Sequence, residues 1–148
     1  MKGWVCQVCG HVEFRENPPD FCPVCHAPKE KFRFDEKAVQ VTGNLGLLTD
    51  LEKKHVPVIR IDRNCGSSAG GCVEVCVSVG EVLHVMEEKH FIGFIDFYLD
   101  DQHLARTSMT PGKINPGACV YLKAAGKSIK AVEWCNVHGR WQAETPLN

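Results

Sequence analysis

The sequence has almost no excess of either charge. Its 17 lysines and arginines stand against 18 aspartates and glutamates, which leaves a formal net charge of −1 at pH 7. A protein that binds nucleic acid or a membrane surface through charge carries a basic patch or stripe. The composition therefore argues against both classes, and we expect no nucleic-acid partner and no membrane partner.

Long hydrophobic runs are also missing. No run approaches the roughly 18 apolar residues that span a bilayer. The N-terminal MKGWVCQVCG has no apolar segment of the kind found in secretory signals, so we expect a cytoplasmic protein. The apolar fraction of 44% still suffices for a packed core, and 148 residues can hold one small and one mid-sized domain.

Cysteine, by contrast, is abundant, with nine in the chain. In a cytosolic protein, cysteines serve more often as metal ligands or reduced thiols than in disulfides. Cys6 and Cys9 form one C-x2-C pair, and Cys22 and Cys25 form a second pair after twelve residues. Two such knuckles predict a tetrahedral all-sulfur site for zinc or a single iron. A fragment this short cannot fold on its apolar core alone, so we expect the bound metal to supply most of its folding stability.

The sequence around these cysteines resembles the rubredoxin-like module of rubrerythrins over about 30 residues. The resemblance implies a one-electron iron at the four cysteines, although their spacing does not distinguish iron from zinc. Glycine usually follows the second knuckle, where this chain has His26. We expect His26 to carry backbone strain and not to be a ligand. The features that carry the resemblance are Trp4, C-x2-C-G, Pro18-Pro19, C-P-x-C, Ala27-Pro28-Lys29 and Phe32.

Residues 35–50 have the composition of a boundary. A charged start and the Gly43-Asn44 break favour a linker and turn, and Val39 and Val41 suit a short edge strand. We therefore predict one domain at 1–36 and a second at 37–148.

Period-two alternation dominates the second domain. Apolar residues alternate with polar or small ones, and the valines within 73–79 share one face. Turn signals, including 66–71, separate the segments. We predict a mainly β protein: a small metal-stapled rubredoxin-like domain followed by a seven-stranded immunoglobulin-like β-sandwich, with no long helix. The strand-like segments are 56–62, 72–80, 90–100, 104–110, 118–126 and 128–136.

The stretch WCNVHGRW at 134–141 indicates a second metal site. It offers Cys135 and His138, and three more histidines lie upstream, His55 in KHVP and His84 and His90 in HVMEEKH. Any one of these histidines alone is more often a surface residue. Together, four imidazoles and one thiolate close five positions around a metal and leave a sixth open for chemistry. This donor set suits redox-active iron better than calcium or magnesium.

These motifs, with TPG at 110–112, resemble the superoxide reductase family of neelaredoxin and desulfoferrodoxin over residues 48–145. The resemblance implies one ferrous iron with four equatorial histidines and an axial cysteine, and a dimer or tetramer. Desulfoferrodoxin also has two domains, but the second cysteine pair of its N-terminal module is adjacent in sequence. The implied ligands are His55, His84, His90, His138 and Cys135.

The implied reaction is the one-electron reduction of superoxide to hydrogen peroxide. An axial thiolate pushes electron density onto iron, which favours reduction over dismutation. Because each turnover consumes an electron, we expect an electron donor protein, rubredoxin or its reductase. The four-cysteine site is then a donor or relay.

Lys54 and Glu52 are the candidate catalytic residues. Lys54 matches a lysine of the family and would attract anionic superoxide. The family has a glutamate directly before that lysine, able to bind ferric iron. This chain has Lys53 there, so Glu52 is one position out of register for that role.

Some cysteines and histidines fit neither site. We expect these cysteines to be small buried hydrophobes, with a Cys65–Cys72 disulfide as the alternative. We expect the two histidines on the surface. The residues are Cys65, Cys72, Cys76, Cys119, His11 and His103.

Two other functions stay open at this point. One is a non-catalytic protein with zinc in the four-cysteine site. The other is a rubredoxin-like electron carrier whose sandwich serves only for docking. Metal analysis with a visible spectrum separates the first from a superoxide reductase, because zinc alone is colourless. The second predicts that Cys135→Ala does not reduce superoxide consumption.

Overall fold

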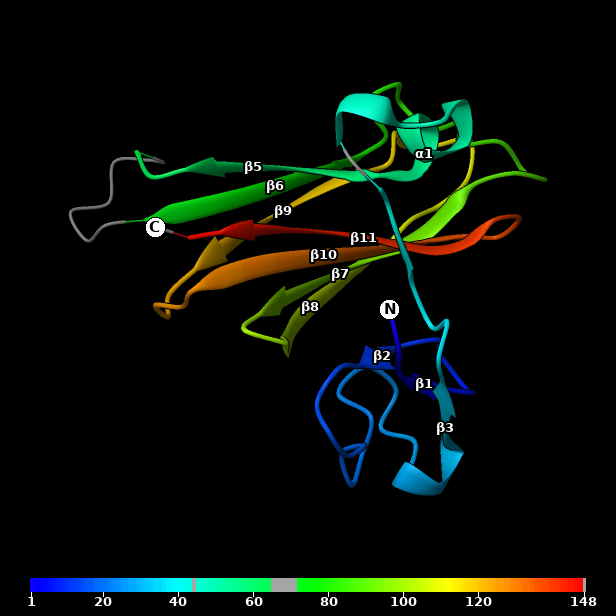
Figure 1. The fold of residues 1–148 in the computed structure, drawn as a ribbon, viewed down its shortest axis with the longest axis vertical. Coiled ribbons are helices and arrows are strands. Elements are labelled where there is room, and N and C mark those ends of the chain that lie inside the picture. Colours follow the sequence, from blue (N-terminus) through cyan, green and yellow to red (C-terminus); the bar gives the residue numbers. More distant parts are fainter. Residues whose placement is uncertain (44, 65–71, 148) are drawn as a thin grey trace.

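The computed structural model describes residues 1–43, 45–64 and 72–147, and most of its regular structure is β-strand. A small three-stranded sheet lies beside two larger sheets (Figure 1). We call residues 1–36 the small unit and the part that contains the two larger sheets the sandwich. The prediction of a mainly β chain, with a cysteine-rich unit ahead of a two-sheet domain, is confirmed.

The small unit is an antiparallel sheet in the order β2-β1-β3. Its strands are β1 Gly3–Cys6, β2 Val12–Glu13 and β3 Phe32–Asp35, and a 3-10 helix η1, Lys29–Lys31, precedes β3. Gly10, with φ 75°, and His26, with φ 60°, adopt the left-handed conformation just after each cysteine pair. His26 therefore has the backbone conformation in which strain was predicted.

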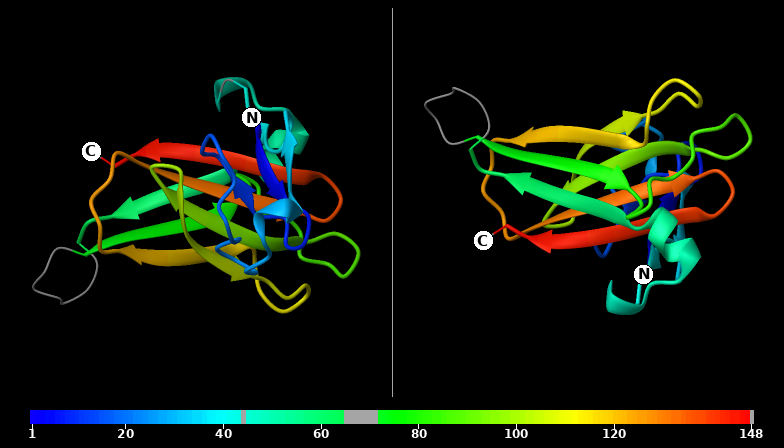
Figure 2. Two further views of the ribbon diagram at one scale, coloured as in Figure 1. Left: turned by 90° about the horizontal axis from the view of Figure 1, so that it is seen from below. Right: turned by 90° about the horizontal axis from the view of Figure 1, so that it is seen from above.

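The sandwich stacks two sheets face to face (Figure 2). One has the order β4-β11-β10-β7-β8 and the other the order β5-β6-β9; among the strands that the structure describes, only the β4–β11 pair is parallel. The inner faces form one apolar core, which includes Val75, Val77, Ile95, Phe97 and Ile129. The strands are β4 Gln40–Val41, β5 Pro57–Asp62, β6 Val73–Val79, β7 Ile92–Leu99, β8 Gln102–Ser108, β9 Gly117–Leu122, β10 Ser128–Cys135 and β11 Gly139–Pro146.

Two short helices, η2 Leu45–Leu47 and α1 Asp50–His55, lie between β4 and β5 in the described part of the chain. The sequence pattern did not predict α1, because six residues show too little periodicity. Its signal is the capping box, in which Thr49 accepts from the Glu52 N–H and the Glu52 carboxylate accepts from the Thr49 N–H. No helix in the described part of the chain is long and apolar enough to cross a membrane.

The six predicted strand segments correspond to β5 through β10, and β4 forms at the predicted edge position. Strand β11 was not predicted, because its first residues coincide with a motif that was assigned to a metal-binding turn. The domain division near residue 37 stays a prediction. Asn44 of the predicted break, the turn at 66–71 and Cys65 lie outside the described residues.

Two expectations about side chains were wrong. His11 is fully buried and His103 is largely covered, because the small unit lies over the sheet face that carries His103. Cys76 and Cys119 form a disulfide and are not free thiols. They face each other directly in the β6–β9 register, which places two cysteines 43 positions apart in sequence side by side. Cys72 is disulfide-bonded as well.

The small unit contacts the outer face of the five-stranded sheet. Tyr98 and Val132 of the sheet form an apolar cluster with Val5 and Val12 of the small unit, joined by Ala38 and Val39. The Tyr98 hydroxyl donates to the Val12 carbonyl at 2.8 Å. This packing fixes the small unit on the sandwich.

A buried ion pair lies at the same contact. Arg106 donates to both carboxylate oxygens of Asp96 at 2.7 and 2.6 Å, and its Nη1 donates to the Cys9 carbonyl at 2.7 Å. Burial alone would raise the pKa of Asp96, but the hydrogen bonds from Arg106 outweigh it and hold that pKa well below its usual range. Asp96 is therefore a buried carboxylate whose charge is stabilised first by Arg106 and then by His103 and His11, which lie 3.4 and 3.8 Å from it.

Replacing Arg106 tests this contact. We expect Arg106→Leu to lower the free energy of unfolding by about 3 to 5 kcal/mol, because it leaves a buried charge without its partner. A control, Lys29→Leu, removes one partner of an exposed ion pair with Asp20 and should cost about 1 kcal/mol or less. Urea denaturation measures both.

The loss should also depend on pH. The partnered Asp96 contributes its full stabilisation above its unfolded pKa of 3.8 and loses it only as pH falls through the lower folded pKa. In Arg106→Leu the pKa of Asp96 rises, so the folded variant takes up a proton in mild acid. The stability difference should therefore be largest at neutral pH and shrink on acidification; a difference that grows in acid would show that Arg106 does not stabilise the Asp96 charge.

Candidate metal centres

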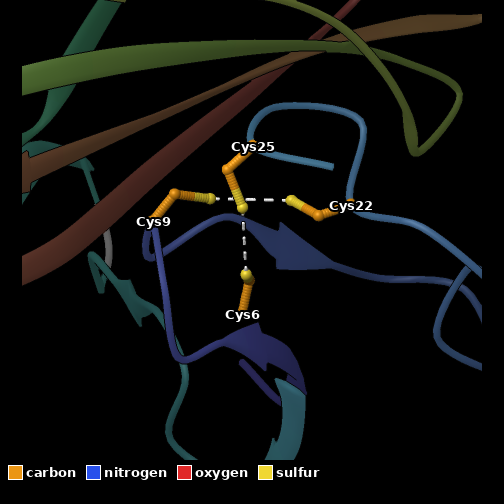
Figure 3. Close-up of side chains that lie close together, drawn as sticks. All are labelled: Cys6, Cys9, Cys22 and Cys25. Carbon is orange, nitrogen blue, oxygen red and sulfur yellow. Dashed lines mark hydrogen bonds between the residues drawn. The ribbon is translucent and has the colours of Figure 1, made fainter. Parts of the chain in front are cut away.

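The four cysteines of the small unit converge on one point (Figure 3). The Sγ atoms of Cys6 and Cys25 are 3.7 Å apart, and those of Cys9 and Cys22 are 3.6 Å apart. A tetrahedral ion with metal–sulfur bonds of about 2.3 Å places its sulfurs about 3.8 Å from one another. The observed spacing fits such an ion.

Backbone N–H groups surround these sulfurs. Cys9, Cys22 and Cys25 each accept from an N–H two or three residues further along the chain. Burial raises the pKa of Cys9 and of Cys22, so both are thiols unless a cation is present. A bound metal would deprotonate them, and the N–H groups would stabilise the resulting charge.

The second site forms where several loops meet at one end of the sandwich. His55 ends α1, His84 and His90 lie between β6 and β7, Cys135 ends β10, and His138 lies in the turn from β10 to β11. His55, His90, Cys135 and His138 each offer a donor atom within 4.8 Å of the other three. His84 Nε2 lies 3.1 Å from His90 Nε2 and 3.6 Å from Cys135 Sγ. All five predicted ligands therefore come together.

Backbone carbonyls orient two of the rings. His55 Nδ1 lies 2.8 Å from the Leu51 carbonyl, and His84 Nδ1 lies 2.6 Å from the Val85 carbonyl. Each Nδ1 must carry the proton to donate, so each Nε2 presents its lone pair to the site. Burial lowers the pKa of His84 to about 4 and lowers that of His55, so both rings are neutral at pH 7.

Cys135 supplies the sulfur from a buried position. Its Sγ accepts from the His138 N–H at 3.4 Å and lies 3.7 Å from His138 Nδ1. Burial raises the pKa of the Cys135 thiol, so a cation is needed to hold it as a thiolate at neutral pH.

The donor set fits a metal ion. Bonds of about 2.1 Å at right angles place neighbouring nitrogens about 3 Å apart, close to the His84–His90 distance. Among the described residues, His55 Nε2 is buried and has no hydrogen-bond partner, which a bound cation would supply. Four imidazoles with one thiolate favour iron or another transition metal over a hard cation.

Several residues that support the ligands had no predicted role. The Asn136 side chain accepts from the Phe91 N–H and donates to the Lys89 carbonyl, which ties the His90 loop to the Cys135 turn. The Trp141 ring stacks on His55 with centroids 5.2 Å apart. Both lie in the CNVHGRW motif, so their closeness in sequence to Cys135 and His138 was the signal from which a supporting role could have been predicted.

Glu133 is the most unusual buried group near the site. It is fully buried, two residues before Cys135, and neither carboxyl oxygen has a hydrogen-bond partner among the described residues. Burial raises the pKa of Glu133 well above its usual value, which favours the neutral form of this side chain.

Lys54 and Glu52 both lie on α1. Lys54 is exposed and directly precedes His55. The Glu52 carboxylate accepts from the Thr49 N–H at 2.7 Å and the Gly43 N–H at 3.3 Å, so it is engaged at the start of the helix. Its assignment as a catalytic residue stays a prediction.

Comparisons with known proteins match both parts of the chain. The family model for desulfoferrodoxin matches residues 48–144, and that for the rubredoxin-like domain of rubrerythrin matches residues 4–33. The chain is 42% identical over 94 residues to a desulfoferrodoxin of Desulfarculus baarsii, covering 63% of this chain and 64% of that one. It is 29% identical over 143 residues to a desulfoferrodoxin homolog of Archaeoglobus fulgidus, covering 97% and 96%.

A solved structure resembles the sandwich. The superoxide reductase (1Fe-SOR) from Giardia intestinalis superimposes with a TM-score of 0.54 at 28% identity, covering 64% of this chain and 99% of that chain.

The two centres should lose their metals independently. We expect the parent chain to bind two metal ions, and Cys135→Ser and Cys25→Ser to bind one each. Cys25→Ser should also lose the β1–β3 sheet, since a structural metal contributes folding energy directly, while Cys135→Ser keeps it. Metal analysis and backbone amide NMR spectra measure these outcomes, and loss of both metals from either variant would contradict two separate sites.

Proposed function

Because this chain belongs to the desulfoferrodoxin family, we propose that it is a superoxide reductase, which reduces superoxide by one electron to hydrogen peroxide. The observation that carries the proposal is the convergence of four imidazoles and one buried thiolate at one end of the sandwich. The proposed ligands are His55, His84, His90, Cys135 and His138.

Iron held by this set supplies one electron per superoxide, and two protons complete the peroxide. The chain's own residues prepare that chemistry. The Leu51 and Val85 carbonyls fix the tautomers of His55 and His84, so the site is built from neutral nitrogen donors. The Cys135 thiolate is electron-rich and favours reduction of the bound substrate over its oxidation. The N–H of His138 orients this sulfur.

The reaction consumes electrons, and the four-cysteine site supplies them in our proposal. The spacing of its sulfurs suits a single iron as well as zinc, and only iron changes its charge. We further propose that the external donor is rubredoxin or its reductase, that the protein works in the cytoplasm, and that it assembles as a dimer or tetramer.

Lys54 attracts the anionic substrate in this proposal. It is exposed and adjacent in sequence to His55, so its charge would act close to one of the proposed ligands. Glu52 would supply a carboxylate ligand to ferric iron in this proposal. That role requires release from the Thr49 and Gly43 N–H groups.

Superoxide generated by a radiation pulse tests the activity. The fully reduced protein should form one peroxide for each superoxide consumed as the histidine-bound iron is oxidised. Cys135→Ser should lose this reaction, while Cys25→Ser keeps the first turnover. Oxygen release with half as much peroxide would identify dismutation and would refute the proposal.

A charge variant tests the steering. Lys54→Ala should lower the second-order rate constant with superoxide by about tenfold or less and should weaken its dependence on salt. Lys53→Ala is the matched control, because it removes the same charge one residue further from His55. If both variants lower the rate constant equally, the attraction comes from the overall positive charge of the helix and not from Lys54 in particular.

A further inference from the structure

We propose that electrons pass within a single chain from the four-cysteine site to the Cys135 site through Arg106, Phe94 and Trp134. This inference rests on the proposed function and adds the residues that connect the two centres. One electron leaves the four-cysteine site, which is thereby oxidised, and one arrives at the Cys135 site, which is thereby reduced. No bond breaks and no proton moves in this step.

The route begins at the first cysteine knuckle. Arg106 Nη1 donates to the Cys9 carbonyl at 2.7 Å, and Arg140 Nε donates to the Gly10 carbonyl at 2.9 Å. Two guanidinium groups from the sandwich thus hold the backbone of a ligand-bearing loop. Gly10 lies beside the Phe94 ring, since a Cβ added at Gly10 would come 3.7 Å from the ring, and the two residues line one groove.

Flat groups then stack in series. The Arg106 guanidinium lies over the Phe94 ring, 3.5 Å from its centroid. Phe94 in turn stacks on Trp134, with centroids 5.8 Å apart and ring planes 14° apart. Electrons tunnel faster through hydrogen bonds and closely packed π systems than across gaps, so this series provides a continuous medium.

The last step crosses the sheet along the backbone. Trp134 is half-buried on the outer face of β10, beside the small unit, whereas Cys135 is fully buried and belongs to the core of the sandwich. The register of β10 against β7 shifts between these two residues. One peptide bond therefore links a ring on the small-unit side to a metal ligand on the other side.

The position of the stack is not required for docking alone. The apolar cluster at Tyr98 and Val132 and the ion pair at Asp96 already fasten the small unit. Phe94 and Trp134 instead line a groove together with Cys6 and Cys9. The rings thus lie at the part of the contact that carries two of the four sulfurs.

Electron redistribution in the iron-loaded full chain tests the route. A substoichiometric pulse of hexachloroiridate oxidises part of the reduced protein, and absorbance then follows transfer between the two centres. A pulse-generated reductant added to the oxidised protein approaches the same equilibrium from the other side. Superoxide takes no part, so the measurement is independent of whether the proposed activity holds.

We expect a first-order rate constant that does not change with protein concentration. Phe94→Leu and Trp134→Leu should each lower it by about tenfold or more. Phe94→Tyr should restore it, because the ring remains. Phe14→Leu is the matched control: it removes a ring that packs on Tyr98 at the same contact but off the route, and it should leave the rate constant unchanged.

Several results would overturn the proposal. They are a rate proportional to protein concentration, equal slowing by Phe14→Leu and Phe94→Leu, no slowing by Phe94→Leu, or no redistribution from either side. Native zinc in the four-cysteine site would also overturn it, because zinc has no redox chemistry. Thermal unfolding of each variant shows that the fold persists before rates are compared.

Discussion

The buried ion pair between Asp96 and Arg106 determines how the two metal-binding parts of this chain meet. Asp96 holds the guanidinium by both of its oxygens, and the guanidinium in turn donates to the Cys9 carbonyl and covers the Phe94 ring. An arginine suits this position because its planar fork pairs with a carboxylate and stacks on an aromatic ring at the same time. A lysine would supply the charge without the geometry.

β10 connects the chemistry of the two parts. Successive side chains of a strand point to opposite faces, so one strand can serve two environments. Val132 packs against the small unit, while Cys135 enters the core and ends beside the histidines. The imidazoles around it come from the end of α1 and from loops, and carbonyls of the adjacent backbone hold two of their rings in place. The site thus combines a ligand on a rigid strand with ligands on a short helix and on loops.

Short motifs made both metal sites predictable, because ligand spacing is a local property. The alternation of valines in 73–79 likewise revealed β6, since one buried face imposes period two. The burial of His11 and His103 could not be predicted, because it depends on which sheet face the small unit covers. The Cys76–Cys119 disulfide depends on the register of β6 against β9, which neither segment encodes alone. α1 and β11 were missed because one is a single capped turn and the other overlaps a ligand motif.

The connection between the two parts is itself attached to the histidine site. β4 runs parallel to β11 and covers its free edge, and the Gln40 side chain donates to the His138 carbonyl at 2.7 Å. A fragment that begins at residue 42 would keep the four imidazoles and the thiolate of the site. Without β4, however, its β11 would present unpaired backbone amides to solvent and to other molecules. The connecting segment that contains β4 thus also shields the turn that carries His138. The isolated sandwich is therefore not equivalent to the sandwich within the whole chain.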